Sequence, residues 1–170
     1  MLHHVSFSVH DTAGVAQGIA NLLKAEALRA PAPPFPDGSW FVVLGDEAGS
    51  LIELTPWGTV FDPREGVAFE PAMSPRSASH VLVSTSRVKD EVLTLANELG
   101  WRASVVDTGL FKFVKIWIDE TLLLEVLPAE FQRGYRDAFN GKNLPTLGQR
   151  LHRLEATVKD ILALRGSHHG

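Results

Sequence analysis

A short pattern occurs twice in this chain, and it constrains the fold more than any other feature of the sequence. The first copy opens with LHHVSFSV and closes with SLIELTP, and the second opens with SASHVLVST and closes with TLLLEVLP. Each opening run carries a histidine, His4 or His80, and each closing run carries one carboxylate, Glu53 or Glu125. The histidines are 76 residues apart and the glutamates 72. Self-similarity of this kind predicts two successive structural units of one type.

The first unit is predicted to contain a strand, a helix, a poorly formed strand and two further strands. Its opening run alternates between polar and apolar residues, which is the period of a half-buried strand. Asp11 and Thr12 are suitable N-cap residues for the helix that follows, and the Pro-rich stretch APAPPFPDGS indicates an irregular loop or a ragged edge strand. The regular elements are expected at 2–9 (strand), 13–27 (helix), 40–44 (strand) and 50–55 (strand).

The second unit repeats this order more regularly. Gly100 ends its helix, because glycine readily adopts the left-handed conformation found after helix C-termini. Short turns, DTG and DET, separate its last three strands. The expected elements are a strand over 79–85, a helix over 87–99, and strands over 101–106, 111–118 and 122–127.

After Pro128 the pattern changes to a helical one. An apolar seam with spacings of three and four residues predicts an amphipathic helix: Leu144, Leu147, Leu151, Leu154, Val158 and Ile161. This helix either packs on its own chain or pairs with a second copy. The predicted organisation is a first module over 1–57, a connecting segment over 58–77, a second module over 78–128 and a C-terminal helical extension over 129–170.

Composition excludes several classes of protein. With 45% hydrophobic and 21% charged residues among 170, the chain is typical of a globular protein. Its net charge of −4 argues against a nucleic-acid partner. No apolar run approaches the roughly 20 residues that a membrane helix needs, and no signal peptide is recognisable, so a cytoplasmic location is expected. The absence of cysteine means that any metal must be bound by nitrogen and oxygen ligands.

The two glutamates are unusual in their setting. Glu53 and Glu125 interrupt runs that are otherwise apolar, where a carboxylate is costly unless it is paired, protonated or bound to a metal. His4 shares the polar face of its strand with Ser6, which suits the lining of a cleft. His10 lies on the same face but about 13 Å further along the strand, too far to share an ion with His4.

These residues resemble the vicinal oxygen chelate superfamily, which includes glyoxalase I, extradiol dioxygenases, and fosfomycin and bleomycin resistance proteins. The resemblance covers residues 1 to about 128. It implies an α+β fold in which two tandem βαβββ modules, with curved mixed sheets, enclose a metal cleft, followed here by the C-terminal helical tail. The motifs HHVSFSVHD, LIELTP, SHVLVS and LLLEVLP carry over four metal ligands: His4, Glu53, His80 and Glu125.

The ligand order His, Glu, His, Glu is most similar to that of bacterial glyoxalase I. The resemblance implies a lyase or isomerase in which a divalent ion (Zn, Ni, Co, Mn or Fe(II)) stabilises an enediolate made from a small oxygenated substrate. Glu125 or Glu53 would act as the general base. Substrate-lining residues are expected to be Ser6, Trp40, Phe113 and Trp117.

Two other functions remain open from the sequence. One is an Fe(II) ring-cleaving dioxygenase of the extradiol type, which does not need a ligand equivalent to Glu53. The other is a metal-free protein that binds or sequesters a hydrophobic ligand in the same cleft. The sequence also leaves open whether the cleft forms within one chain or between the chains of a homodimer.

Overall fold

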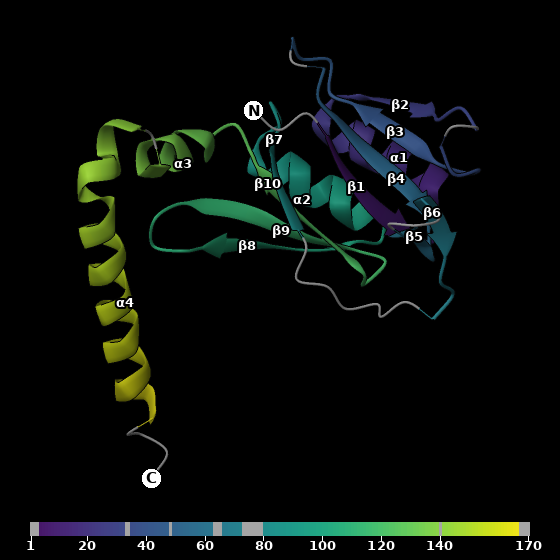
Figure 1. The fold of residues 1–170 in the computed structure, drawn as a ribbon. Coiled ribbons are helices and arrows are strands. Elements are labelled where there is room, and N and C mark those ends of the chain that lie inside the picture. Colours follow the sequence, from purple (N-terminus) through teal and green to yellow (C-terminus); the bar gives the residue numbers. More distant parts are fainter. Residues whose placement is uncertain are drawn as a thin grey trace.

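Two four-stranded mixed sheets, one from each repeat, form the main body of the protein (Figure 1). The computed structural model describes residues 4–32, 35–47, 49–62, 66–72, 80–139 and 141–166. In the first sheet the strand order is β1-β4-β3-β2, and β1 runs parallel to β4. The first module consists of β1 (His4–Val9), α1 (Thr12–Leu23), β2 (Glu26–Arg29), β3 (Trp40–Val43) and β4 (Leu51–Pro56).

The second module has the same topology. Its strand order is β7-β10-β9-β8, again with the first strand parallel to the last and the other pairs antiparallel. The elements are β7 (His80–Ser84), α2 (Lys89–Glu98), β8 (Arg102–Asp107), β9 (Lys112–Ile118) and β10 (Leu122–Leu127). The predicted α+β fold with two βαβββ units is therefore confirmed.

The first helix is shorter than predicted. It ends at Leu23 and not near residue 27, because Lys24 adopts the left-handed conformation (φ 57°) and its N–H returns to the carbonyls of Ala20 and Asn21. Residues Glu26–Arg29 then pair with β3 as an edge strand. The irregular strand of this module thus precedes the Pro-rich stretch and does not lie within it.

The predicted connecting segment contains regular structure. Strands β5 (Thr59–Asp62) and β6 (Gly66–Phe69) pair as a separate two-stranded sheet. The Trp57 N–H donates to the carbonyl of Val9, which attaches the start of this segment to the end of β1. The sequence showed little periodicity here because each strand has only four residues.

A single hydrophobic core joins the two modules. On each sheet the side chains that face the helix are apolar, and these faces pack together with α1 and α2. Each apolar side chain removed from water contributes roughly 1.5–3 kcal/mol. The fully buried large side chains belong to both modules: Val9, Ile19, Leu22, Val42, Ile52, Leu54, Val92, Val114, Ile116, Ile118, Leu124 and Val126.

The second module also satisfies the C-terminal carbonyls of α1, which have no partner within the helix. The Oγ1 of Thr85 donates to the carbonyl of Leu22 at 3.0 Å, and this bond is buried. The guanidinium of Arg87 donates to the carbonyl of Asn21 at 2.9 and 3.1 Å. Polar contacts as well as apolar packing therefore hold the modules together.

The C-terminal extension contains α3 (Gln132–Phe139), a short 3-10 turn (Gly141–Asn143) and α4 (Leu144–Gly166). The predicted helix is present as α4, which extends away from the two sheets (Figure 1). Leu154 packs on Gly109, whereas Leu151 is 43% exposed. Among the seam residues whose side chains are described, only some are therefore covered by the rest of the protein. No helix among the described residues is long and apolar enough to cross a membrane.

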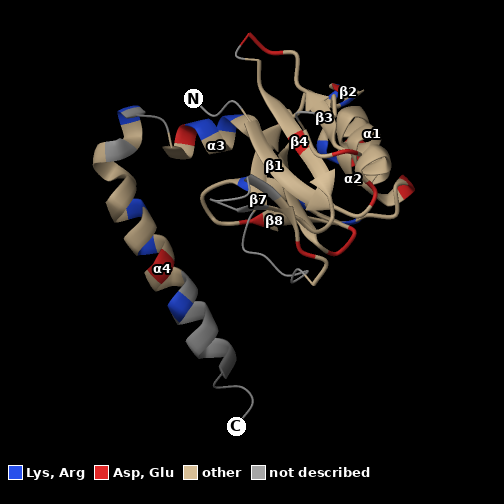
Figure 2. Ribbon diagram, turned by 45° about the vertical axis from the view of Figure 1, so that its right-hand side comes forward, with Lys and Arg blue, Asp and Glu red and all other residues tan. Residues whose placement is uncertain are grey.

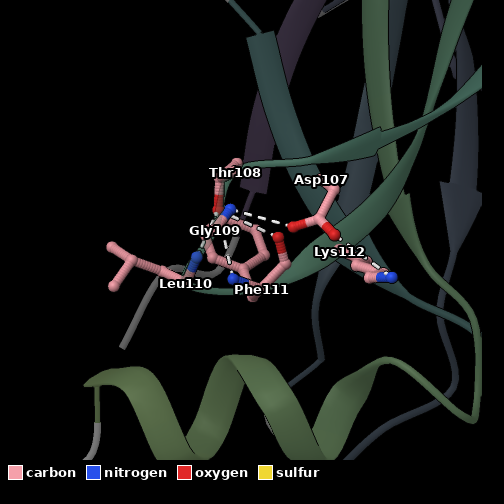
Figure 3. A network of polar contacts seen from close by, with 6 residues as sticks. All are labelled: Asp107, Thr108, Gly109, Leu110, Phe111 and Lys112. Atoms are coloured by element: carbon pink, nitrogen blue, oxygen red, sulfur yellow. Dashed lines mark hydrogen bonds and ion pairs between the residues drawn. The ribbon is translucent and has the colours of Figure 1, made fainter. Parts of the chain in front are cut away.

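The turn between β8 and β9 is held by a network of polar contacts (Figure 3). Asp107 accepts a hydrogen bond from the Gly109 N–H at 2.9 Å and forms an ion pair with Lys112 at 3.1 Å. The Gly109 N–H bond, followed by the Lys112 ammonium, lowers the pKa of Asp107 below its usual value. The Thr108 hydroxyl donates to the carbonyl of Phe111. This turn supports Phe111, whose ring packs against two aromatic rings of α3. The ring centroids of Tyr135 and Phe139 lie 4.9 and 5.6 Å from that of Phe111.

Candidate functional site

Glu53 is the buried carboxylate of the first module. It lies on β4 beside Ser6 of β1, on the face of the sheet that points away from α1. Ser6 Oγ donates a 2.5 Å hydrogen bond to Oε2 of Glu53, and Glu53 is only 6% exposed. Charged residues elsewhere lie mainly in helices and loops (Figure 2). Among the described residues, Glu53 is the charged residue that is buried, and it has a specific partner.

His4 lies at the place where the modules meet. It is exposed, it pairs in register with Leu51, and it lines a pocket of ≈ 440 Å³ together with Leu82 and Ser84 of β7. The hydroxyl that donates to Glu53 belongs to Ser6, the next residue but one along β1 on the same face as His4. His10, further along β1, stacks on Trp57 with 4.7 Å between ring centroids.

The second module brings its predicted pair together. His80 Nε2 lies 3.9 Å from Oε2 of Glu125, and the two side chains are 49% and 15% exposed. Both lie on the sheet face that points away from α2, because their neighbours in sequence, Val81, Leu124 and Val126, belong to the core. An imidazole and a carboxylate on adjacent strands are the kinds of donor that could supply part of an N/O metal shell.

Lys115 is the residue directly opposite Glu125 in the antiparallel β9–β10 pair. Its Nζ lies over the ring of Trp117, 5.4 Å from the centroid, and Trp117 occupies the same sheet face two residues along β9. Arg102 approaches the same ring at 6.0 Å but is paired with Glu120 at 2.7 Å. The second half of the candidate site therefore includes a cation and an aromatic ring.

The four residues expected to line the substrate cleft have different locations. Ser6 and Trp117 lie on the faces that carry Glu53 and Glu125. Phe113 shares the face of Glu125 but is only 6% exposed and contacts Phe111 at 5.7 Å. It belongs to the aromatic cluster under α3 more than to an open cleft.

Trp40 lies on the other face of its sheet. It pairs in register with Leu54 and packs against the core, whereas its neighbour Phe41 pairs with Glu53. Phe41 and Lys115 are thus the cross-strand neighbours of the two glutamates, and the sequence reasoning did not identify either. Counting positions back from each glutamate across the hairpin would have found them, had the register been known.

The four predicted ligands are nitrogen and oxygen donors, a set that suits a divalent ion. Within the described residues, which include all four predicted ligands, no three His, Asp or Glu side chains lie close enough together to hold a metal ion. In the second module His80 and Glu125 lie 3.9 Å apart. In the first module the Ser6 hydroxyl orients Glu53. The predicted ligands therefore fall into two groups, called half-sites below: His4 and Glu53 on the sheet of the first module, and His80 and Glu125 on the sheet of the second.

Comparison with known proteins gives information at the level of the fold. No family model and no curated protein sequence matches the chain. A solved structure of the fosfomycin resistance protein FosX from Listeria monocytogenes matches 81% of this chain and 97% of its own, with 15% identity and a TM-score of 0.54. Another structure of this FosX, complexed with Mn(II) and a sulfate ion, matches 75% of this chain and 88% of its own at 14% identity and a TM-score of 0.50. FosX proteins are members of the vicinal oxygen chelate superfamily, and the chain has the fold of that superfamily.

Proposed function

We propose that this protein is a metal-dependent enzyme that transfers a proton on a small oxygenated substrate, as a lyase or isomerase of the glyoxalase kind. The observation that carries the proposal is the His80–Glu125 pair, 3.9 Å apart on a sheet face that points away from the core. A partly buried carboxylate beside an imidazole, in a strand that is otherwise apolar, is well suited to bind a divalent ion.

The complete shell would be formed between two chains. No three of the predicted ligands, all of them among the described residues, lie close enough to share an ion, which supports an arrangement in which the first half-site of one protomer faces the second half-site of its partner. Closed twofold assembly would create two equivalent sites per dimer. Mn(II) is the first ion to test, since it is bound in a FosX structure of the same fold.

A bound divalent ion would polarise two adjacent substrate oxygens and make a neighbouring C–H proton more acidic. Glu125 is the proposed general base. Its side chain is partly exposed, whereas Glu53 is more buried and is held by the Ser6 hydroxyl, which favours a fixed ligand role for Glu53. His4 and His80 would complete the shell.

Mixing of two inactive variants tests the metal site and its location together. The first variant is His4→Ala with Glu53→Gln, and the second is His80→Ala with Glu125→Gln. If the site lies between chains, refolding equal amounts together restores about one quarter of the wild-type sites, because heterodimers retain one intact site. Mn(II) binding, followed by the relaxation rate of water protons, is the readout, and His152→Ala on α4 is the control.

Each other outcome has a definite meaning. If the wild-type protein binds no divalent ion, the proposal is overturned and a metal-free ligand-binding protein is favoured. If the separate variants lose the ion but the mixture does not recover it, the shell forms within one chain. If each variant still binds one ion at full affinity, the four predicted ligands are wrong.

A further inference from the structure

We infer that Lys115 binds an oxyanion group of the substrate, next to the carboxylate of Glu125. The inference rests on the proposed function, since it defines the substrate class of the same site. It assigns a specificity role to a residue outside the predicted metal shell. The substrates it selects are small molecules with a carboxylate, phosphate or phosphonate group close to the reacting carbon.

The position of Lys115 is fixed by strand register. It lies opposite Glu125 on one side and opposite Ser104 on the other, in the middle of the sheet face that carries His80. Directly opposed residues in an antiparallel pair have Cβ atoms about 4.5–5.5 Å apart. A group bound at the His80–Glu125 pair is therefore within reach of the lysine side chain.

Among the described residues, no carboxylate forms an ion pair with the ammonium of Lys115. Although Glu125 is opposite, no ion pair forms between them, and Glu125 instead approaches His80 at 3.9 Å. The ammonium lies over Trp117, 5.4 Å from the ring centroid. This contact orients the lysine side chain and leaves its positive charge able to interact with a ligand. Arg102, the other cation at this ring, is already paired with Glu120.

On the sheet face that carries Glu125, the region around Lys115 and Trp117 is left for the anion. Phe113, the preceding residue of β9 on the same face, is covered and contacts the aromatic cluster under α3. Lys115 and Trp117 remain partly exposed. In the first module the position equivalent to Lys115 is Phe41, opposite Glu53, so only the second half-site supplies a cation at this place.

Equilibrium dialysis with inorganic sulfate at constant ionic strength tests the inference on the full-length chain. Sulfate is a suitable probe because it remains a dianion near neutral pH and does not precipitate Mn(II); acetate is measured in parallel, to distinguish a tetrahedral anion site from a carboxylate site. Lys115→Met should weaken binding of the preferred anion by about 10-fold, the scale of one lost charge-assisted hydrogen bond. Lys115→Arg should retain most of the affinity.

Lys112→Met is the matched control, because Lys112 is on the same strand but faces the other way and is paired with Asp107. It should leave anion binding unchanged. Mn(II) affinity is measured separately: Lys115→Met should leave it unchanged or raise it, since a like charge near the ion is removed. Thermal unfolding of each variant verifies that the fold is intact.

A metal-free arm separates this inference from the proposed function. Glu125→Gln removes the negative charge that repels an anion, so sulfate binding can be measured in that background without Mn(II), with and without Lys115→Met. If Mn(II) does not bind but sulfate affinity still depends on Lys115, the proposed function fails and the anion site stands. If neither anion binds more weakly to Lys115→Met, or if Lys112→Met has the same effect, the inference is overturned.

Discussion

Ser6 Oγ donates a 2.5 Å hydrogen bond to Oε2 of Glu53 across the parallel β1–β4 pair. The carboxylate has little access to water, since Glu53 is only 6% exposed. A buried acceptor that loses its donor incurs most of its desolvation cost. Ser6 therefore stabilises the buried carboxylate of Glu53 in the first half-site.

Replacing Ser6 by alanine should lower the free energy of unfolding by about 1–3 kcal/mol at neutral pH, because the buried Glu53 carboxylate loses the hydroxyl that donates to it. Urea denaturation measures the change. Ser104→Ala is the matched control: this serine is exposed on β8, and its loss should change stability by no more than about 0.5 kcal/mol. Equal stability of the two variants would contradict the importance of the Ser6 bond.

Gly18 on α1 is required by close packing against the second module. A Cβ at this position would lie 2.5 Å from the Trp101 ring and 3.1 Å from Leu99. Gly18→Ala should destabilise the protein by about 1–3 kcal/mol through overpacking, despite a gain of up to about 1 kcal/mol in helix propensity. Gly134→Ala on α3, where a Cβ meets nothing within 4 Å, should instead be neutral or stabilising. Chemical denaturation of both variants gives the comparison, and a stable Gly18→Ala protein would disprove the tight contact.

Thr85 links the modules through the carbonyl of Leu22. Thr85→Val keeps the shape of the side chain but removes the buried donor, so the free energy of unfolding should fall by about 1–3 kcal/mol. Hydrogen exchange should also become faster in the last turn of α1. Thr94→Val, at an exposed position of α2, is the control and should change stability by at most about 0.5 kcal/mol. Unchanged exchange in α1 would contradict a linking role for Thr85.

Asp107 should give stability that depends on acid pH. Its pKa is lowered in the folded protein, so the charged form favours folding above its usual pKa of 3.8, and this contribution is lost as pH falls through the lower folded value. Asp107→Asn should therefore be less stable than wild type at neutral pH and equal to it at the acid limit. Because Asp107 is exposed, the difference will be small. Urea denaturation at several pH values measures it, and a difference independent of pH would refute the assignment.

The repeat predicted the fold well because strand alternation and helix caps are local properties. Asp11 caps α1 through the Gly14 N–H as expected, and both parallel strand pairs form at the predicted runs. The edge strand β2 was missed because its residues, Glu26–Arg29, continue a helix-forming sequence. It becomes a strand only by pairing with β3, which is a tertiary effect.

The candidate site was less predictable than the fold. The sequence identified His80 and Glu125, and the structure places their side chains 3.9 Å apart. The distances between ligands of different modules depend on how the two sheets pack, which the sequence does not reveal. Trp40 was expected to line the cleft but packs against the core. Its strand, WFVV, is apolar throughout, so no alternation indicates which face each side chain occupies. Lys115 was overlooked for a similar reason, since its relation to Glu125 depends on hairpin register.

The two copies of the repeat have diverged at the positions beside each glutamate. Ser6 and Phe41 flank Glu53, whereas Leu82 and Lys115 flank Glu125. A cleft with two identical halves would accept a prochiral molecule in either of two orientations, and either carboxylate could then remove a proton. With a lysine opposite one glutamate and a phenylalanine opposite the other, the two orientations of an anionic molecule would differ in energy. If the two half-sites form one cleft as proposed, an anionic substrate would present its reacting carbon to one glutamate and not to both, even though the two sheets have the same topology.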